Sequence, residues 1–118
     1  MSLSLTIRKS GEVTVVDASG RITLGEATGA LRETVQTEAE KNTKILLNLA
    51  DVSYIDSAGL GEMLGSYTSV RNRGGDLKLL NVQKKIHDLL QITRLYTIFE
   101  TFEDEATAIA SYSKSASA

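Results

Sequence analysis

Two periodicities of apolar residues alternate along this chain, and this alternation constrains the fold more than any other feature of the sequence. Leu3, Leu5 and Ile7 alternate with polar residues, and the same period-two pattern resumes after Gly11, which predicts an opening β-hairpin. Beyond the hairpin the apolar spacing changes from strand-like to helix-like and back until the chain ends. Strands that alternate with helices in this way predict a largely parallel sheet covered by helices.

The predicted elements follow one another without a linker. Helices are expected at about 26–40, 57–73, 82–90 and 103–112, and the later strands at 44–49, 77–80 and 97–101. Gly20 and Gly25 mark a loop before the first helix, with Thr23 between them, and Asp51–Ser53 form a polar break before the second helix. The first helix is expected to bury Ala27, Ala30, Leu31, Val35 and Ala39.

These elements make a single α/β domain in the order β-β-α-β-α-β-α-β-α. Its sheet is mixed but mostly parallel, with an antiparallel opening hairpin and amphipathic helices on one face or on both. We expect residues 1–112 to form the domain and residues 113–118, which are Ser, Ala and one Lys, to form a frayed tail.

The composition excludes several classes of protein. Among 118 residues there is no Cys and a single His, so a thiolate metal site cannot form, and a zinc site or catalytic triad would depend on His87 alone. We therefore expect no catalytic residue, no metal and no cofactor. The 13 basic and 15 acidic residues give a net charge of −2, which argues against nucleic-acid binding. No apolar run exceeds three residues and no secretory signal is present, so we expect a cytoplasmic protein that does not enter a membrane.

Three glycines in the second predicted helix contradict its helical pattern. Gly59, Gly61 and Gly65 each cost about 0.8–1 kcal/mol relative to alanine inside a helix, so each needs a structural or functional reason. We expect Gly61 and Gly65 to pack closely against the sheet. Gly59 lies in the first turn, where bare backbone would allow a partner to approach.

Asp56 and Ser57 stand at the junction between a strand and this helix. Their residue types favour helix capping, because either side chain can accept a hydrogen bond from a free backbone N–H. The alternative is a hydroxyl that accepts a phosphoryl group, since free N–H groups and the helix dipole both favour negative charge at this point. Asp56 would then orient the hydroxyl or accept its proton.

The segment around this junction resembles the signature of the STAS domain, and that of the bacterial anti-sigma factor antagonists in particular. The resemblance is carried by Asp51-Val52, then Ile55-Asp56-Ser57-Ala58-Gly59-Leu60-Gly61, then Met63-Leu64. It extends to Gly20-Arg21-Ile22 and the hairpin before it, and to the closing elements, so nearly the whole chain is covered. The short motif lies at the expected place in the β/α order, which makes the match specific.

This resemblance implies a partner-switching mechanism. Family members bind an anti-sigma factor that is also a serine kinase and thereby release the sigma factor. The kinase phosphorylates the residue that matches Ser57, the complex weakens, and a serine phosphatase acting on phospho-Ser57 restores the binding form. The resemblance places Asp56, Ser57, Ala58, Gly59 and Thr23 on the partner-binding surface.

Two positions depart from the family pattern. Thr23 stands where an Asp is often found, and a threonine cannot form an ion pair with an arginine of the partner. Arg94 stands where a glycine is common, which affects a surface turn.

Three alternatives compete with the switch. A non-switching STAS scaffold or accessory module, of the stressosome or lipid-transport type, shares the fold, but the Asp56-Ser57 pair favours a switch. A phospho-acceptor receiver domain needs an acidic cluster after its first strand and a late-strand lysine, and the chain offers only Asp17 and no lysine in 97–101. An enzyme would need a base for Ser57, and the Gly59-Leu60-Gly61 run matches neither a nucleophile elbow nor a phosphate-binding loop.

Overall fold

Five strands form one sheet, and the order of elements predicted from the sequence is confirmed. The computed structural model describes residues 3–117, and for residues 114–117 the backbone alone. The strands are β1 (Leu3–Ser10), β2 (Val13–Ile22), β3 (Lys44–Ile55), β4 (Asp76–Leu80) and β5 (Thr101–Phe102). The helices are α1 (Glu26–Lys41), α2 (Ser57–Asn72), α3 (Lys84–Ile92) and α4 (Glu105–Ser117), with a 3-10 turn η1 (Leu95–Thr97) after α3.

The strands lie in the order β1-β2-β3-β4-β5 across the sheet. β1 and β2 pair antiparallel as the opening hairpin, and every other pairing is parallel. A parallel pair requires a crossover connection, and α1, α2 and α3 supply the three crossovers. The mixed, mostly parallel sheet expected from the sequence is therefore confirmed.

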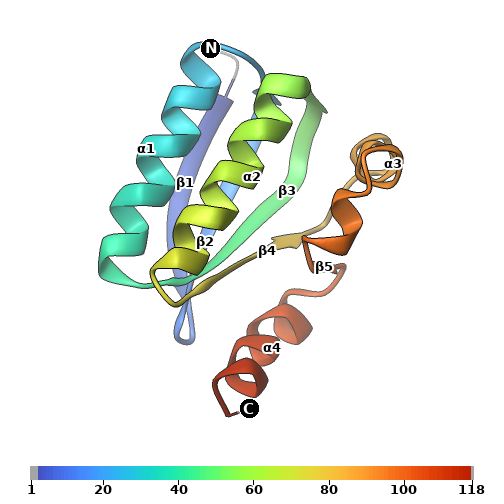
Figure 1. Cartoon of the computed structure of the whole chain (residues 1–118). Coiled ribbons are helices and arrows are strands. Elements are labelled where there is room, and N and C mark those ends of the chain that lie inside the picture. The colour runs from blue at the N-terminus through green and yellow to red at the C-terminus, as the bar shows by residue number, and fades with distance from the viewer. Residues whose placement is uncertain (1–2, 118) are drawn as a thin grey trace.

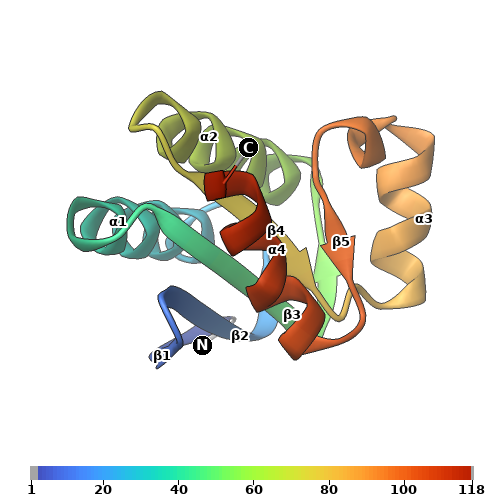
Figure 2. The same ribbon diagram turned by 90° about the horizontal axis from the view of Figure 1, so that it is seen from below.

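Helices cover both faces of the sheet (Figures 1 and 2). The larger apolar cluster lies under α1 and α2 and includes the buried residues of α3. The smaller cluster lies on the opposite face under α4, where Val13, Val15, Leu46 and Leu80 meet Ala108 and Tyr112. Within residues 3–117, no helix is both long and apolar enough to cross a membrane.

Strands β2 and β3 are longer than the sequence predicted. The expected loop at Gly20 and the expected polar break at Asp51–Ser53 are both wrong, because these residues pair with each other in the parallel ladder, Gly20 opposite Val52. Polar side chains in this stretch face solvent while Val52 is buried, so the pairing continues. As a result the β3 strand extends to Ile55, which lies opposite Ile22 at the end of β2.

The last strand is present but shorter and later than expected, so the predicted bounds 97–101 are wrong. Residues 95–97 form a 3-10 turn, and the backbone N–H groups of Ile98 and Phe99 both donate to the carbonyl of Leu95, at 3.0 Å. Arg94 begins this turn with a φ of +63°, a left-handed conformation that favours glycine. Only Thr101 and Phe102 remain as strand.

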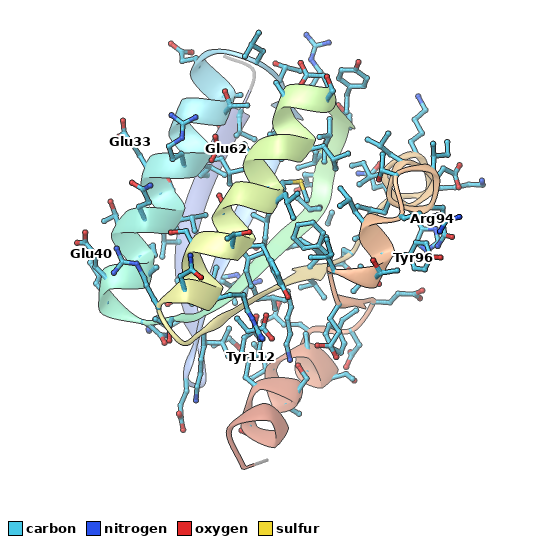
Figure 3. The ribbon with its side chains drawn as sticks, in the orientation of Figure 1. Glu33, Glu40, Glu62, Arg94, Tyr96 and Tyr112 are labelled. Carbon is cyan, nitrogen blue, oxygen red and sulfur yellow. The ribbon has the colours of Figure 1, made fainter. Side chains whose placement is uncertain are left out.

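Helix α4 is attached to the sheet by buried polar groups as well as by apolar contact. The Tyr112 side chain points from α4 toward the sheet (Figure 3), and its hydroxyl donates to the Ile45 carbonyl. Burial raises the pKa of this hydroxyl far above its ordinary value. Lys78, only 1% exposed, donates to Ser111 at 2.8 Å and lies over the Tyr112 ring.

Two helices differ from expectation in small ways. Ala30, expected on the buried face of α1, is exposed, because that face is narrower than the alanine spacing suggested. Helix α4 continues to Ser117, beyond the expected end of the domain at residue 112. The expectation of a frayed tail stays a prediction, since residue 118 and the side chains of 114–117 lie outside the described residues.

Candidate functional site

Ser57 is the first residue of α2 and is exposed, immediately after β3 ends. The parallel pairing brings the carboxyl ends of β2 and β3 to the same edge of the sheet, so the turn between β2 and α1 lies beside the start of α2 (Figure 1). Ligands of open α/β sheets bind outside the carboxyl ends of the strands, at this edge. The sheet therefore presents Ser57 where a partner can reach it.

Asp56 is the N-cap of α2, so the capping role suggested by its residue type is confirmed. The backbone N–H of Gly59 donates to one carboxylate oxygen at 2.7 Å, and the backbone N–H of Leu24 donates to the other at 3.0 Å. These two donors, that of Leu24 above all, hold the pKa of the Asp56 carboxyl below its ordinary value. One carboxylate thus fixes both the start of α2 and the β2–α1 turn.

The glycines of α2 have roles opposite to those expected. A Cβ at Gly59 would overlap the carbonyl oxygen of Ile22 and lie 2.9 Å from the carbonyl carbon, so Gly59 is required for packing and is buried. Gly61 has nothing within 4 Å of its missing Cβ, and Gly65 has only the carboxylate of Glu62, at 4.0 Å. The expectation that Gly59 presents bare backbone is wrong, and so is the expectation that Gly61 and Gly65 pack closely.

The reason lies in how α2 joins the sheet. The Ile22 carbonyl that excludes a side chain at Gly59 also accepts the backbone N–H of Asp56, at 3.2 Å. The first turn of α2 therefore lies directly against the end of β2. Thr23 follows Ile22 and is half-buried, as is Ala58, so the structure brings all five predicted site residues to one end of the molecule.

A hollow of about 370 Å³ opens beside Ser57, between the start of α2 and α3. Asp56 and Ser57 line one side of it, and Lys85 and Leu89 of α3 line the other. Tyr54, half exposed, forms part of its wall. The edge thus combines a hydroxyl, an ionised carboxylate and a cation with exposed apolar surface.

Sequence reasoning missed Leu24, Tyr54 and Lys85. Leu24 is 78% exposed although its backbone is held by Asp56. The sequence held one signal for Leu24: it lies between Thr23 and Gly25, in a segment expected to be a loop, and a large apolar residue is unusual in a short polar turn. Lys85 could not be placed from the sequence, since its nearness to Ser57 depends on how α3 packs.

The described residues offer no evident metal centre. No group of three or more His, Asp or Glu side chains within residues 3–117 could hold a metal ion. His87 is exposed on α3, which agrees with its interpretation as a solvated histidine.

Comparison with known proteins gives a consistent picture. Residues 4–108 match the family model of the STAS domain. The chain is 33% identical over 100 residues to an anti-sigma-B factor antagonist of Bacillus subtilis, an alignment that covers 85% of this chain and 91% of the relative.

Solved structures show the same fold. An anti-sigma factor antagonist from Mycobacterium paratuberculosis superposes with a TM-score of 0.79 at 18% identity, covering 94% of each chain. The Bacillus cell fate determinant SpoIIAA, in its phosphorylated form, superposes with a TM-score of 0.67 at 21% identity, covering 88% of this chain and 96% of that one. At these identities the likeness concerns the fold.

Proposed function

The chain belongs to the STAS domain family, and from this premise we propose that it is an anti-sigma factor antagonist whose binding is controlled by phosphorylation of Ser57. In its unphosphorylated form it binds an anti-sigma factor that is also a serine kinase, and so releases the sigma factor. A serine phosphatase acting on phospho-Ser57 returns it to the binding form. The protein is a substrate in this cycle and catalyses no step of it.

The observation that carries the proposal is the exposed Ser57 hydroxyl at the first position of α2, on a backbone fixed from both sides. Asp56, the residue before Ser57, accepts the backbone N–H of Leu24 in the β2–α1 turn, and Gly59, two residues after Ser57, packs against Ile22. A kinase requires a hydroxyl that can be held in line with the γ-phosphate, and an accessible serine on a rigid frame meets that need.

Asp56 has a defined part in the proposed switch. Both of its oxygens accept backbone N–H groups, so its main task is to position Ser57 rather than to act as a free base. Its negative charge persists beside Ser57, because the same two donors lower its pKa. A phosphoryl group on Ser57 would therefore meet like charge at its nearest neighbour.

The charge change is large for so small a protein. A phosphoryl group adds about −1.5 to −2, so phosphorylation would take the net charge from −2 to about −4. The added charge would lie inside the interface, where desolvation opposes binding. The relatives support this interpretation, since they are anti-sigma factor antagonists and one similar structure is of a phosphorylated form.

A second candidate function is a non-switching STAS scaffold or accessory module, which is compatible with the same fold. It would predict a large assembly rather than a one-to-one complex with a kinase. Size-exclusion chromatography with light scattering distinguishes the two, because a stable high-order assembly of the purified chain would contradict the switch.

The central test replaces the proposed phosphorylation site. Ser57→Ala should fold normally and capture the kinase from the native cytoplasm, and ATP should release the kinase from the wild-type protein but not from the variant. Ser53→Ala is the matched control, because Ser53 is exposed and lines the same hollow. Ser57→Asp should bind about ten-fold more weakly than wild type, since one carboxylate imitates a phosphate incompletely.

Mass spectrometry after ATP treatment locates the phosphate independently. We expect it on Ser57 alone. Phosphate confined to the serines of residues 113–117, or release of Ser57→Ala by ATP, would refute the proposal.

A further inference from the structure

The outer face of α2 has a surface with almost no side chains. Gly61, Gly65 and Ser69 recur every four residues on this face, and we call them the bare strip. All three line a hollow of about 470 Å³ on the side toward α1 and another of about 710 Å³ on the opposite flank. The bare strip is thus a ridge of helix backbone between two hollows.

The fold does not need these two glycines. A Cβ at Gly61 would have nothing within 4 Å, and a Cβ at Gly65 would make one ordinary contact. Alanine is the better helix former at both positions, so the glycines weaken α2 without any packing benefit inside this chain. Their benefit must come from a contact outside it.

A second, independent observation points to the same place. Ser66 is only 5% exposed, and its hydroxyl oxygen is buried with no hydrogen-bond partner among the backbone of residues 3–117 and the side chains that the structure describes. Ser66 lines the hollow between α1 and α2. A buried hydroxyl without a partner is unfavourable, and a rotation of the Ser66 side chain toward the hollow would let a polar group from outside stabilise it.

This hollow is continuous with the edge that carries Ser57. Ala58, the next residue along the chain, lines it. A standard interface buries roughly 800 Å² on each partner, which corresponds to a disc of roughly 16 Å radius. Gly65 lies eight residues beyond Ser57, or about 12 Å along the helix, so a partner centred on Ser57 would also cover Gly61 and Gly65, the first two residues of the bare strip.

The rim of the hollow has the character of an interface edge. The Arg32 guanidinium of α1 and the Glu62 carboxylate of α2 form an ion pair at 2.6 Å, and Figure 3 shows Glu62 between the two helices. A polar, charged rim is typical of protein–protein contacts. Small residues spaced by four let a second helix come close to the backbone.

We propose that a helix of the anti-sigma partner lies along the bare strip of α2 and places one hydrogen-bonding side chain against the Ser66 hydroxyl. This inference rests on the proposed function, because the same partner covers Ser57. It extends the binding surface from the phosphorylation site over two further turns of α2. It also assigns to Gly61 and Gly65 the close approach of a partner that the sequence had suggested for Gly59 instead.

The kinase is first purified by capture on wild-type protein, as in the test of the proposed function. Calorimetry then measures its affinity for wild type and for three variants. Gly65→Leu fills the strip and should weaken binding at least 30-fold. Ser66→Ala should weaken it about five-fold while raising the melting temperature of the free protein, because the unpaired hydroxyl is gone. Ala30→Leu adds a similar side chain on an exposed position of α1 and should change neither quantity.

Ser66→Ala is expected to weaken kinase binding while it raises the melting temperature, and this combination separates binding from folding. If Ser66 had a purely structural role, its replacement would raise stability without any loss of affinity for the kinase. If wild type binds the kinase and Gly65→Leu binds equally well, the strip is not in the interface and this inference is wrong while the proposed function stands. If wild type binds no kinase, both the proposed function and this inference are wrong. A dimer of the free chain that Gly65→Leu dissociates would assign the strip to a second copy and would likewise overturn the inference.

Discussion

Gly59 carries a hydrogen atom where alanine carries a methyl group, and this difference lets the first turn of α2 lie directly against the end of β2. The carbonyl of Ile22 occupies the space that a Cβ would need, and it also receives the backbone N–H of Asp56. The position of Ser57 is therefore set by backbone contacts, which do not depend on side-chain rotamers. Only glycine permits this approach.

Matched alanine substitutions test this account. Gly59→Ala should lower the free energy of unfolding by about 3 kcal/mol, because the overlap is with backbone that cannot rotate away. Gly61→Ala should raise it by about 0.5–1 kcal/mol, since the new methyl group enters open space and favours the helix. Urea unfolding followed by circular dichroism measures both, and equal effects at the two positions would contradict the packing described here.

These glycines also show what sequence reasoning can reach at the scale of one residue. It identified all three as exceptional because their cost in a helix is known, and it placed Asp56 and Ser57 correctly at the helix start. It was wrong about which glycines face the sheet and which face solvent. The rotation of α2 about its axis depends on contacts with Ile22, which is far away in sequence. No periodicity within α2 contains that information.

At the scale of elements, α4 is held on the sheet by a charged cluster. The Arg8 guanidinium contacts the Asp17 carboxylate at 2.7 Å and the Glu105 carboxylate of α4 at 2.7 Å. Asn48 donates to Asp17 at 2.8 Å. The hydrogen bonds from Arg8 lower the pKa of both acids, and the two acids raise the pKa of Arg8.

This cluster predicts a loss of stability in acid. A carboxyl whose pKa is lower in the folded state contributes its full stability above its ordinary pKa of about 4, and loses it as the pH falls through the folded value. Stability should therefore fall from about pH 5 downward, and Arg8→Met should flatten this dependence. At neutral pH the variant should lose about 1 kcal/mol, because the groups are partly exposed and solvent screens them.

Thermal unfolding between pH 2 and 7 provides the measurement. Lys9→Met removes an equal charge from the same strand, and the Lys9 ammonium donates to the Thr14 hydroxyl rather than to a carboxylate, so the acid dependence of this variant should match wild type. An unchanged acid slope in Arg8→Met would show that other carboxyls dominate.

The elements also separate what was predictable from what was not. The four helices and the opening hairpin were found because each carries a clear period within its own residues. The length of β3 was underestimated because its second half is stabilised by pairing with β2, which local polarity does not reveal. The last strand was placed too early because the apolar residues of the 3-10 turn and those just after it resemble a short strand in sequence.

Considered as a whole molecule, the protein separates its two kinds of surface. The start of α2 with Ser57 lies at one end, and α4 packs against the sheet toward the other (Figure 1). The charged cluster that holds α4 contains none of the predicted partner-binding residues. Stability at one end and binding at the other should therefore be separable.

This separation is testable with two variants already described. Arg8→Met should keep the affinity of wild type for the kinase while losing stability. Ser57→Asp should lose affinity while its melting temperature stays within about 2 °C of wild type, because Ser57 is exposed and a carboxylate suits a helix start. Calorimetric binding and thermal unfolding of both proteins give the four values, and parallel changes in the two quantities would contradict the separation.

The three glycines of α2 have a consequence for how the sequence can vary. In a saturation library selected only for folded protein, Gly59 should remain invariant while Gly61 and Gly65 drift toward alanine and larger helix formers. If the same library is selected for release of the sigma factor, all three should be retained. Comparing the two selections would distinguish glycine kept for the chain's own architecture from glycine kept for a neighbour, which an alignment of natural sequences shows merely as conservation.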